Sequence, residues 1–263
     1  MYNPKFRIKS NNVPVLSKEE IDNIAEKFLM DFNPETLVTP QPIDEDRFLT
    51  EYLGLEQDFQ YLSHCGCYLG MLVFNDTNKV QVYDIYTGRA EYISAKAGTV
   101  IIDNTLLEEG QEQRYRFTAI HEAGHWIFHR KKYYRDMAQI SLFDFIDMPN
   151  IQCRTVSVDP KFKPIHKWDD NYTMEWQANY FSSAVLMPKS MVFKICNDED
   201  YIEHLRLMSW GDTKRYNELL IRRISNIFNV SKQAAEVRLN NLKIINSYDD
   251  NKYTPTAKFN NAI

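Results

Sequence analysis

The sequence predicts an α+β fold that is mostly helical, contains a small antiparallel sheet and ends in a further helical region. Apolar residues recur at helical spacing in several segments, the longest of them at about 110–131. Three other segments are instead apolar runs or alternate between apolar and polar residues, as strands do: residues 67–74, 80–86 and 99–103. The composition is that of a globular protein, since 44% of the residues are hydrophobic and 25% are charged.

The N-terminal part of the chain is predicted to contain two helices. Ser17 and Glu20 have the spacing of a capping box, and apolar residues recur at helical spacing over 21–32. A second helix is predicted over 44–53, before a glycine that suits a helix end. Residues 1–16 are polar with two prolines and are expected to form an extended arm.

The middle of the chain is predicted to form the sheet. Residues 67–74 and 80–86 are expected to pair as a hairpin across the turn at 75–78, which is rich in Asn and Asp. Residues 99–103 form another short strand in this prediction. The sheet then leads into the long helix at about 110–131.

The C-terminal part is predicted to be helical after an irregular stretch at 132–170. A loop of that length in a compact domain is usually functional, and we expect it to form part of a cleft wall. The helices are predicted at 173–187, at about 189–196, 199–209 and 213–228, and at 232–241. These elements divide the chain into a first domain over 17–188, a helical region over 189–246 and a disordered tail over 247–263.

Charge and composition argue against several classes of protein. The net charge of −5 does not favour nucleic-acid binding. No apolar run is as long as a membrane span, and the first residues lack the apolar core of a secretory signal. Cys65 and Cys67 beside His64 lack the paired spacing of a structural zinc site and are expected to be small core residues. With only four cysteines, we expect a cytoplasmic protein with no membrane partner.

The motif His121-Glu122-Ala123-Gly124-His125 carries the clearest chemical signal. Residues four apart share a helix face, so His121 and His125 can bind one metal ion, while Glu122 can reach a water on that ion. This is the arrangement of a zinc hydrolase with two His ligands, a third ligand from elsewhere and a carboxylate base. The alternative is a surface helix that carries two histidines and a glutamate. It is disfavoured because apolar residues recur around the motif and predict a buried helix: Phe117, Ile120, Gly124, Ile127 and Phe128.

A catalytic zinc site needs a third protein ligand. The candidates are Glu175, His129, His166 and Asp169. Glu175 is favoured because the small Ala178 would let its helix pack closely on the HExxH helix. Asn179 shares a face with Glu175 and can hydrogen-bond the outer nitrogen of a His ligand. The alternative for Glu175 is a solvated carboxylate at a helix start. His129 points away from the metal. We expect it either to lie beside a metal-binding residue or to take part in packing.

Two segments are similar to the ImmA/IrrE family of zinc metallopeptidases. The first is Arg116-Phe117-Thr118 followed by the HExxH motif, and the second runs from Glu175 to Pro188 in the pattern ExxANxFAxxLLMP. The second departs from the pattern only at Ser182, in place of Ala, and at Val185, in place of Leu. The resemblance implies a zincin-like metallopeptidase core and a helix-turn-helix-like region over 189–246. It also implies Zn²⁺ as cofactor, with His121, His125 and Glu175 as its ligands and Glu122 as the catalytic base.

The resemblance further implies an endopeptidase whose substrate is a DNA-binding repressor, cut to activate genes of a mobile element or a stress response. In that reaction Glu122 would take a proton from a zinc-bound water and pass it to the leaving amine. Tyr172 and His166 are candidates for stabilising the oxyanion, because both lie near Glu175 in the sequence.

The helices around Asn229-Val230-Ser231 leave other functions open. Between residues 214 and 243 seven basic residues oppose two acidic ones, and the helix, turn and helix resemble a DNA-binding motif. Packing or protein docking is preferred to DNA binding because the whole chain is acidic. The rival hypotheses are a regulator that binds zinc and DNA without cutting, and a zinc hydrolase that acts on a non-protein amide.

Overall fold

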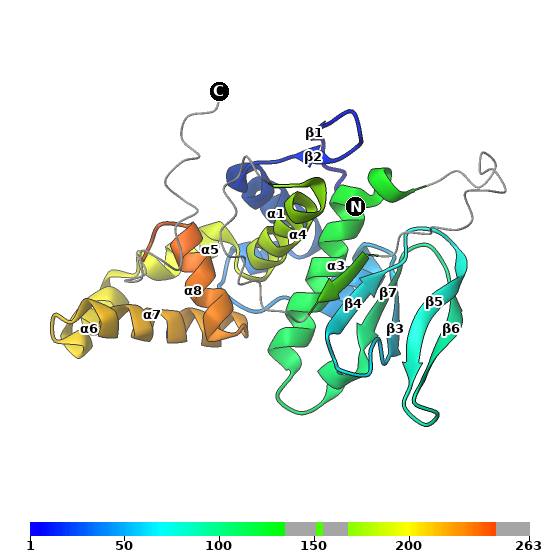
Figure 1. Cartoon of the computed structure of the whole chain (residues 1–263). Helices are drawn as coiled ribbons and strands as arrows, with labels where there is room; N and C mark the ends of the chain where they lie inside the picture. The colour runs from blue at the N-terminus through cyan, green and yellow to red at the C-terminus, as the bar shows by residue number, and fades with distance from the viewer. Residues whose placement is uncertain (135–150, 155–167, 246–263) are drawn as a thin grey trace.

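The computed structural model describes residues 1–134, 151–154 and 168–245, with only the backbone described for 151–154. Its central element is α3 (Glu112–Tyr133), which lies between a sheet on one side and the helices α1 and α4 on the other (Figure 1). The other helices are α1 (Lys18–Phe32), α2 (Glu45–Arg47), α4 (Asp170–Leu186), α5 (Lys189–Cys196), α6 (Glu199–Ser209), α7 (Thr213–Phe228) and α8 (Lys232–Asn241), with short helical turns η1 (Pro34–Leu37), η2 (Phe48–Tyr52) and η3 (Asn104–Leu107). The strands are β1 (Arg7–Ile8), β2 (Pro14–Val15), β3 (Glu56–Gln60), β4 (Tyr68–Leu72), β5 (Thr77–Asp84), β6 (Arg89–Ala95), β7 (Thr99–Asp103) and β8 (Ile151–Arg154). The α+β class and the helical majority that we predicted are confirmed.

The sheet beside α3 has the strand order β3-β7-β4-β8 and is mixed. Strand β7 pairs in parallel with β3 and antiparallel with β4, so the prediction of an antiparallel sheet is wrong for β3. Both faces of β4 and β7 are covered. Side chains such as Leu72 and Ile102 join the main core beside α3, while Met71 and Ile101 pack under the β5–β6 hairpin. This burial explains why both strands are almost wholly apolar.

The predicted hairpin between residues 67–74 and 80–86 is wrong. Strand β4 pairs with β7 and β8, whereas β5 pairs with β6. The hairpin turn lies at 85–88, where the Asp84 carboxylate accepts hydrogen bonds from the Tyr86 and Thr87 backbone N–H groups and Gly88 has a φ of 68°. Strand β6 carries no apolar pattern because most of its residues are exposed.

The predicted helices are confirmed, and the segment predicted over 44–53 consists of the short helix α2 and the π-helical turn η2. Ser17 and Glu20 form the expected capping box at the start of α1. Helix α7 ends at Asn229, which has a φ of 50°, and Ser231 caps α8 by accepting a hydrogen bond from the Ala234 N–H. The region behind Leu186 is therefore helical, while the helix-turn-helix and its preferred use in packing or protein docking stay predictions.

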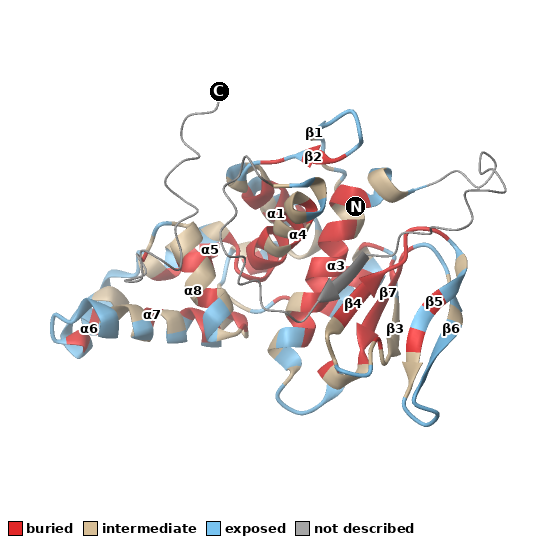
Figure 2. Ribbon diagram, in the orientation of Figure 1, coloured by how far each residue is buried: buried red, intermediate tan, exposed pale blue. Residues whose placement is uncertain are grey.

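Helices α3 and α4 approach each other closely at Gly124. A Cβ atom on this glycine would lie 3.2 Å from the Ala178 Cα and 3.2 Å from the Phe181 ring. Ser182, which replaces an alanine of the family pattern, donates a hydrogen bond of 2.9 Å to the Phe117 carbonyl of α3. The middle of α3 and most of α4 are buried, whereas α6 and the β5–β6 hairpin are largely exposed (Figure 2). The close contact sets the distance between the side chains that the two helices share.

A buried arginine attaches the C-terminal helices to the rest of the molecule. Arg238 of α8 is fully buried, lies 2.8 Å from the Asp22 carboxylate and donates a hydrogen bond to the Met187 carbonyl. Tyr180 donates to the second oxygen of Asp22. Arg238 is therefore not available to contact a nucleic acid. The division at residue 188 stays a prediction.

Some predictions fall on parts of the chain outside the described residues. The stretch at 132–170 contains β8, which we did not predict, but 135–150 and 155–167 are not described. This leaves out His166 and most of the expected cleft wall. The expected disordered tail at 247–263 also lies outside the described residues. Within 1–134, 151–154 and 168–245, no helix has the length and apolar character needed to cross a bilayer.

Candidate metal centre

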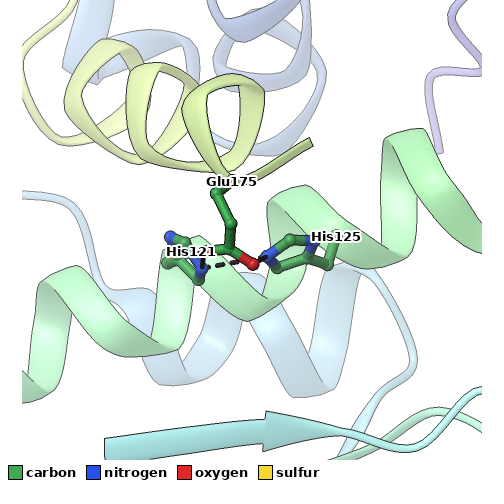
Figure 3. A group of neighbouring side chains, drawn as sticks. All are labelled: His121, His125 and Glu175. Carbon is green, nitrogen blue, oxygen red and sulfur yellow. Dashed lines mark hydrogen bonds and ion pairs between the residues drawn. The ribbon is translucent and has the colours of Figure 1, made fainter. Parts of the chain in front are cut away.

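The structure brings together the three side chains that the resemblance implies as ligands. His121 and His125 lie one turn apart on α3, and their Nε2 atoms are 2.9 Å apart. Glu175 reaches down from α4, with its carboxylate oxygens 3.5 Å from His121 Nε2 and 3.4 Å from His125 Nε2 (Figure 3). All three donor atoms therefore converge on one point between the two helices. Among the described residues, this is the group with the composition and spacing to hold a metal ion.

The donor set and its spacing fit zinc. Ligands held about 2.0–2.2 Å from a tetrahedral Zn²⁺ ion lie roughly 3.3 Å from one another. The distances between the ligating atoms of His121, His125 and Glu175 are 2.9 to 3.5 Å. Two imidazoles and one carboxylate also match the protein ligands of many catalytic zinc sites, which keep a fourth position free for water.

The two imidazoles are held by their outer nitrogens. His121 Nδ1 lies 3.0 Å from Asn179 Oδ1, and His125 Nδ1 lies 2.9 Å from His129 Nδ1. Since the Asn oxygen only accepts, His121 donates from Nδ1 and keeps the Nε2 lone pair for the centre. Asn179 and His129 thus lie beside the candidate ligands, which are the places that we expected for them.

Gln177 is a residue of this centre that sequence reasoning missed. Its amide oxygen lies 2.9 Å from His129 Nε2, and its amide nitrogen donates to the Pro14 carbonyl of β2 at 2.9 Å. The signal was a polar residue next to Ala178 in a helix expected to pack closely on another. A polar side chain in such a position needs hydrogen-bond partners.

Glu122 lies on the same turn of α3 but its carboxylate faces β4. It is fully buried, and neither oxygen has a hydrogen-bond partner among the described residues. Burial raises the pKa of Glu122 to about 8, in spite of the nearby His121 ring. Gly70 of β4 makes the room for this side chain, because a Cβ atom there would lie 2.8 Å from Glu122 Oε1. An isolated carboxylate with a raised pKa suits a group that takes and releases a proton.

Ionisation of the other groups favours cation binding. Burial opposes a charge on Glu175, but its closeness to the His121 and His125 rings holds the pKa well below the usual range. Burial lowers the pKa of His125 and, more strongly, that of His129. At neutral pH the centre therefore offers the neutral imidazole of His125 and the carboxylate anion of Glu175, which are the protonation states that a metal requires.

The other candidates lie elsewhere. Asp169 caps α4 by accepting a hydrogen bond from the Tyr172 backbone N–H, and the Tyr172 ring packs on Trp168. The exposed Cys65 and the partly buried Cys67 lie in the turn before β4, and each has its sulfur within 4.0 Å of the Ser63 hydroxyl. They are therefore not the small core residues that we expected.

Comparison with known proteins adds evidence that does not depend on this geometry. Residues 157–240 match the family model of the IrrE N-terminal-like domain, a peptidase family. The resemblance to the ImmA/IrrE family is confirmed over this segment. No curated protein matches the chain. The match supports a peptidase, and a peptidase acts on a protein substrate.

The matched segment and the HExxH motif are separate parts of the chain. The match to the IrrE N-terminal-like domain contains Glu175 and Asn179, whereas the motif at 121–125 lies upstream of it. The match to the family model also runs through α5 to α8, across the domain boundary that we expected at residue 188.

Proposed function

We propose that the protein is a zinc-dependent endopeptidase that acts in the cytoplasm on a DNA-binding repressor. One observation carries the proposal. His121 and His125 come from outside the segment that matches the peptidase family, yet Glu175 inside it lies within 3.5 Å of both. The repressor as substrate rests on the resemblance to the ImmA/IrrE family.

In the proposed reaction, His121, His125 and Glu175 hold the ion. When bound, Zn²⁺ supplies Lewis acidity, which polarises the peptide carbonyl and acidifies a water molecule. Glu122 would accept a proton from the water that attacks the carbonyl, and as the peptide C–N bond breaks it would give that proton to the nitrogen of the leaving amine. The burial that raises the pKa of Glu122 also increases the affinity of its carboxylate for the proton that it accepts from the water.

Exchange of Glu122 for Gln tests the proposal. The Glu122→Gln protein should bind one Zn²⁺ per chain like the unaltered protein, because Glu122 is not among the three ligands. It should lose turnover, because Gln has no basic oxygen and cannot accept the proton. The measurement is co-expression with candidate repressors encoded beside the gene, followed by immunoblotting for their fragments and by metal analysis of the purified protein.

The outcomes separate the proposal from its rivals. Cleavage of a repressor by the unaltered protein and not by Glu122→Gln supports it. Equal cleavage by both proteins would remove Glu122 from the mechanism. Binding of zinc and DNA by both proteins without any cleavage would instead support a regulator. The burial of Arg238 already removes one basic side chain from a DNA-binding surface on α7 and α8.

A further inference from the structure

A line of hydrogen bonds leads from the candidate metal centre through the interior to the N-terminal arm. It runs from His125 Nδ1 to His129 Nδ1, from His129 Nε2 to Gln177 Oε1, and from Gln177 Nε2 to the Pro14 carbonyl, each step being 2.9 Å long. His129 is fully buried and Gln177 is 1% exposed. The line joins α3, α4 and β2, three elements that are far apart in the sequence.

The Pro14 end fixes the direction of every bond in this line. A backbone carbonyl only accepts, so the Gln177 amide must point its NH₂ group at Pro14 and its oxygen at His129. The Gln177 oxygen also only accepts, so His129 donates from Nε2. A neutral imidazole has one N–H group, which leaves His129 Nδ1 as an acceptor, and His125 must then donate from Nδ1. The Nε2 lone pair of His125 therefore faces the centre.

The hydrogen-bond partners of His129 suit a neutral ring. Its two ring nitrogens contact His125 and Gln177, and neither of these partners carries a negative charge. A charged imidazolium with such partners in the interior would be costly. A protonated His129 would also donate to His125 and reverse its tautomer.

We propose that Gln177 and His129 are positioning residues of the metal centre, which hold His125 in the tautomer and ring orientation that bind the ion. This inference rests on the zinc site of the proposed function. Asn179 holds the tautomer and orientation of His121 directly, since its side-chain oxygen accepts a hydrogen bond from His121 Nδ1. Because His129 is neutral where many metal sites have a carboxylate, the support adds no negative charge beside the ion.

The N-terminal arm is the anchor of this line and is itself held on α4. Lys9 forms an ion pair of 2.7 Å with Asp170, and Asn11 donates to the other oxygen of the same carboxylate. The Phe6 ring packs edge-on against Phe128, the residue before His129. These contacts keep the Pro14 carbonyl in place, so the arm forms part of the support of the metal centre.

Substitutions at His129 and Gln177 test the proposal through metal affinity. We expect His129→Leu and Gln177→Leu to lower the affinity for Zn²⁺ by about 10–100-fold, the effect found for groups that orient metal-binding His side chains. His129→Asn should recover much of the loss of His129→Leu, because the Asn oxygen takes the place of His129 Nδ1 as acceptor. The measurement is competition for Zn²⁺ with a chromophoric chelator, with the visible spectrum of the Co²⁺ protein as a second readout of ligand geometry.

Val185→Ala is the matched control, since it removes buried volume from α4, the helix that carries Gln177, without touching the hydrogen bonds. It should lower thermal stability and leave both the Zn²⁺ affinity and the Co²⁺ spectrum unchanged. Unchanged affinity in His129→Leu, no recovery in His129→Asn, or an equal loss in Val185→Ala would each overturn the positioning role while the zinc site stands. An unaltered protein that binds no Zn²⁺ would overturn the proposed function and this inference together.

Discussion

Glu122 combines full burial with two carboxylate oxygens that have no hydrogen-bond partner among the described residues. In water this group would ionise with a pKa near 4.5, whereas in the folded, metal-free protein burial raises the pKa to about 8. Between these two pH values the folded chain holds a proton that the unfolded chain has released. The contribution of Glu122 to the free energy of unfolding must therefore fall as the pH rises from about 4.5 to about 8.

This linkage predicts a pH-dependent gain in stability for Glu122→Gln, because Gln resembles the neutral carboxyl group. For the metal-free proteins, the substitution should change stability little near pH 4.5 and stabilise above pH 8, by an amount on the order of a few kcal/mol. Urea unfolding of both proteins at several pH values measures the difference. A difference that does not change with pH would show that the carboxyl group titrates normally.

Gly70 offers a second test at the scale of single residues. Ala at this position would bring its Cβ to 2.6 Å from the Thr118 side chain and 2.8 Å from Glu122 Oε1, so the carboxylate has to move. Since a displacement of about 1 Å in a catalytic group can cost about 100-fold, we expect Gly70→Ala to lose up to that factor in kcat. Zn²⁺ affinity should be unchanged, because the three ligands are not displaced. Reduced affinity with normal turnover would contradict this role for Gly70.

Two of the candidate ligands could be predicted from local sequence, because the i, i+4 spacing of His121 and His125 brings them together in any helix. Glu175 needed the family pattern as well, since nothing local says which distant carboxylate approaches a helix. Gln177 and Gly70 could not be found in this way. Their roles depend on contacts with Pro14 and Glu122, and such contacts exist only after the elements have packed.

At the scale of elements, the spacing between α3 and α4 decides whether the ligands meet. Gly124→Ala would favour the helix itself by about 1 kcal/mol. However, the new Cβ would lie 3.2 Å from the Ala178 Cα and from the Phe181 ring, which forces the helices apart by a few tenths of an ångström. We expect Zn²⁺ affinity to fall by on the order of tenfold, since Glu175 moves away from the histidines.

Gly70→Ala is the matched control for Gly124→Ala. Both add one methyl group to a buried glycine, but one displaces the catalytic base and the other separates the ligands. Titration of the two proteins with Zn²⁺ should show a loss of affinity only for Gly124→Ala. Equal affinities would mean that α4 adjusts without moving Glu175.

The helices were predictable and the strand pairing was not, for a physical reason. Helix ends are set by local groups such as Ser17, Ser231 and Asn229, which are visible in the sequence. Strand partners are set by packing over long separations. Asn and Asp at 75–78 suggested a hairpin turn, but the Asp84 side chain closes the turn further along the chain.

At the scale of the whole molecule, the buried pair of Arg238 and Asp22 joins the first helix to the last one described. Removal of one partner from a buried ion pair leaves an uncompensated charge, so Arg238→Met should lower the free energy of unfolding by about 3–5 kcal/mol. Asp22→Leu combined with Arg238→Met should recover much of this loss. Urea unfolding checks both values.

The same experiment tests the division of the chain at residue 188. If α5 to α8 unfold together with the peptidase core, Arg238→Met will shift a single transition followed by both fluorescence and circular dichroism. Two transitions, of which only one shifts, would indicate that residues 189–246 fold as a separate domain.

The exposure of the three candidate ligands is uneven. The His121 and His125 side chains are fully buried, while that of Glu175 is 40% exposed. Among the described residues, Glu175 is therefore the ligand on the open side of the centre, and we expect an ion to leave past this carboxylate as it swings outward. The rate of zinc loss to an excess of chelator should accordingly reach a plateau that no longer depends on how much chelator is added.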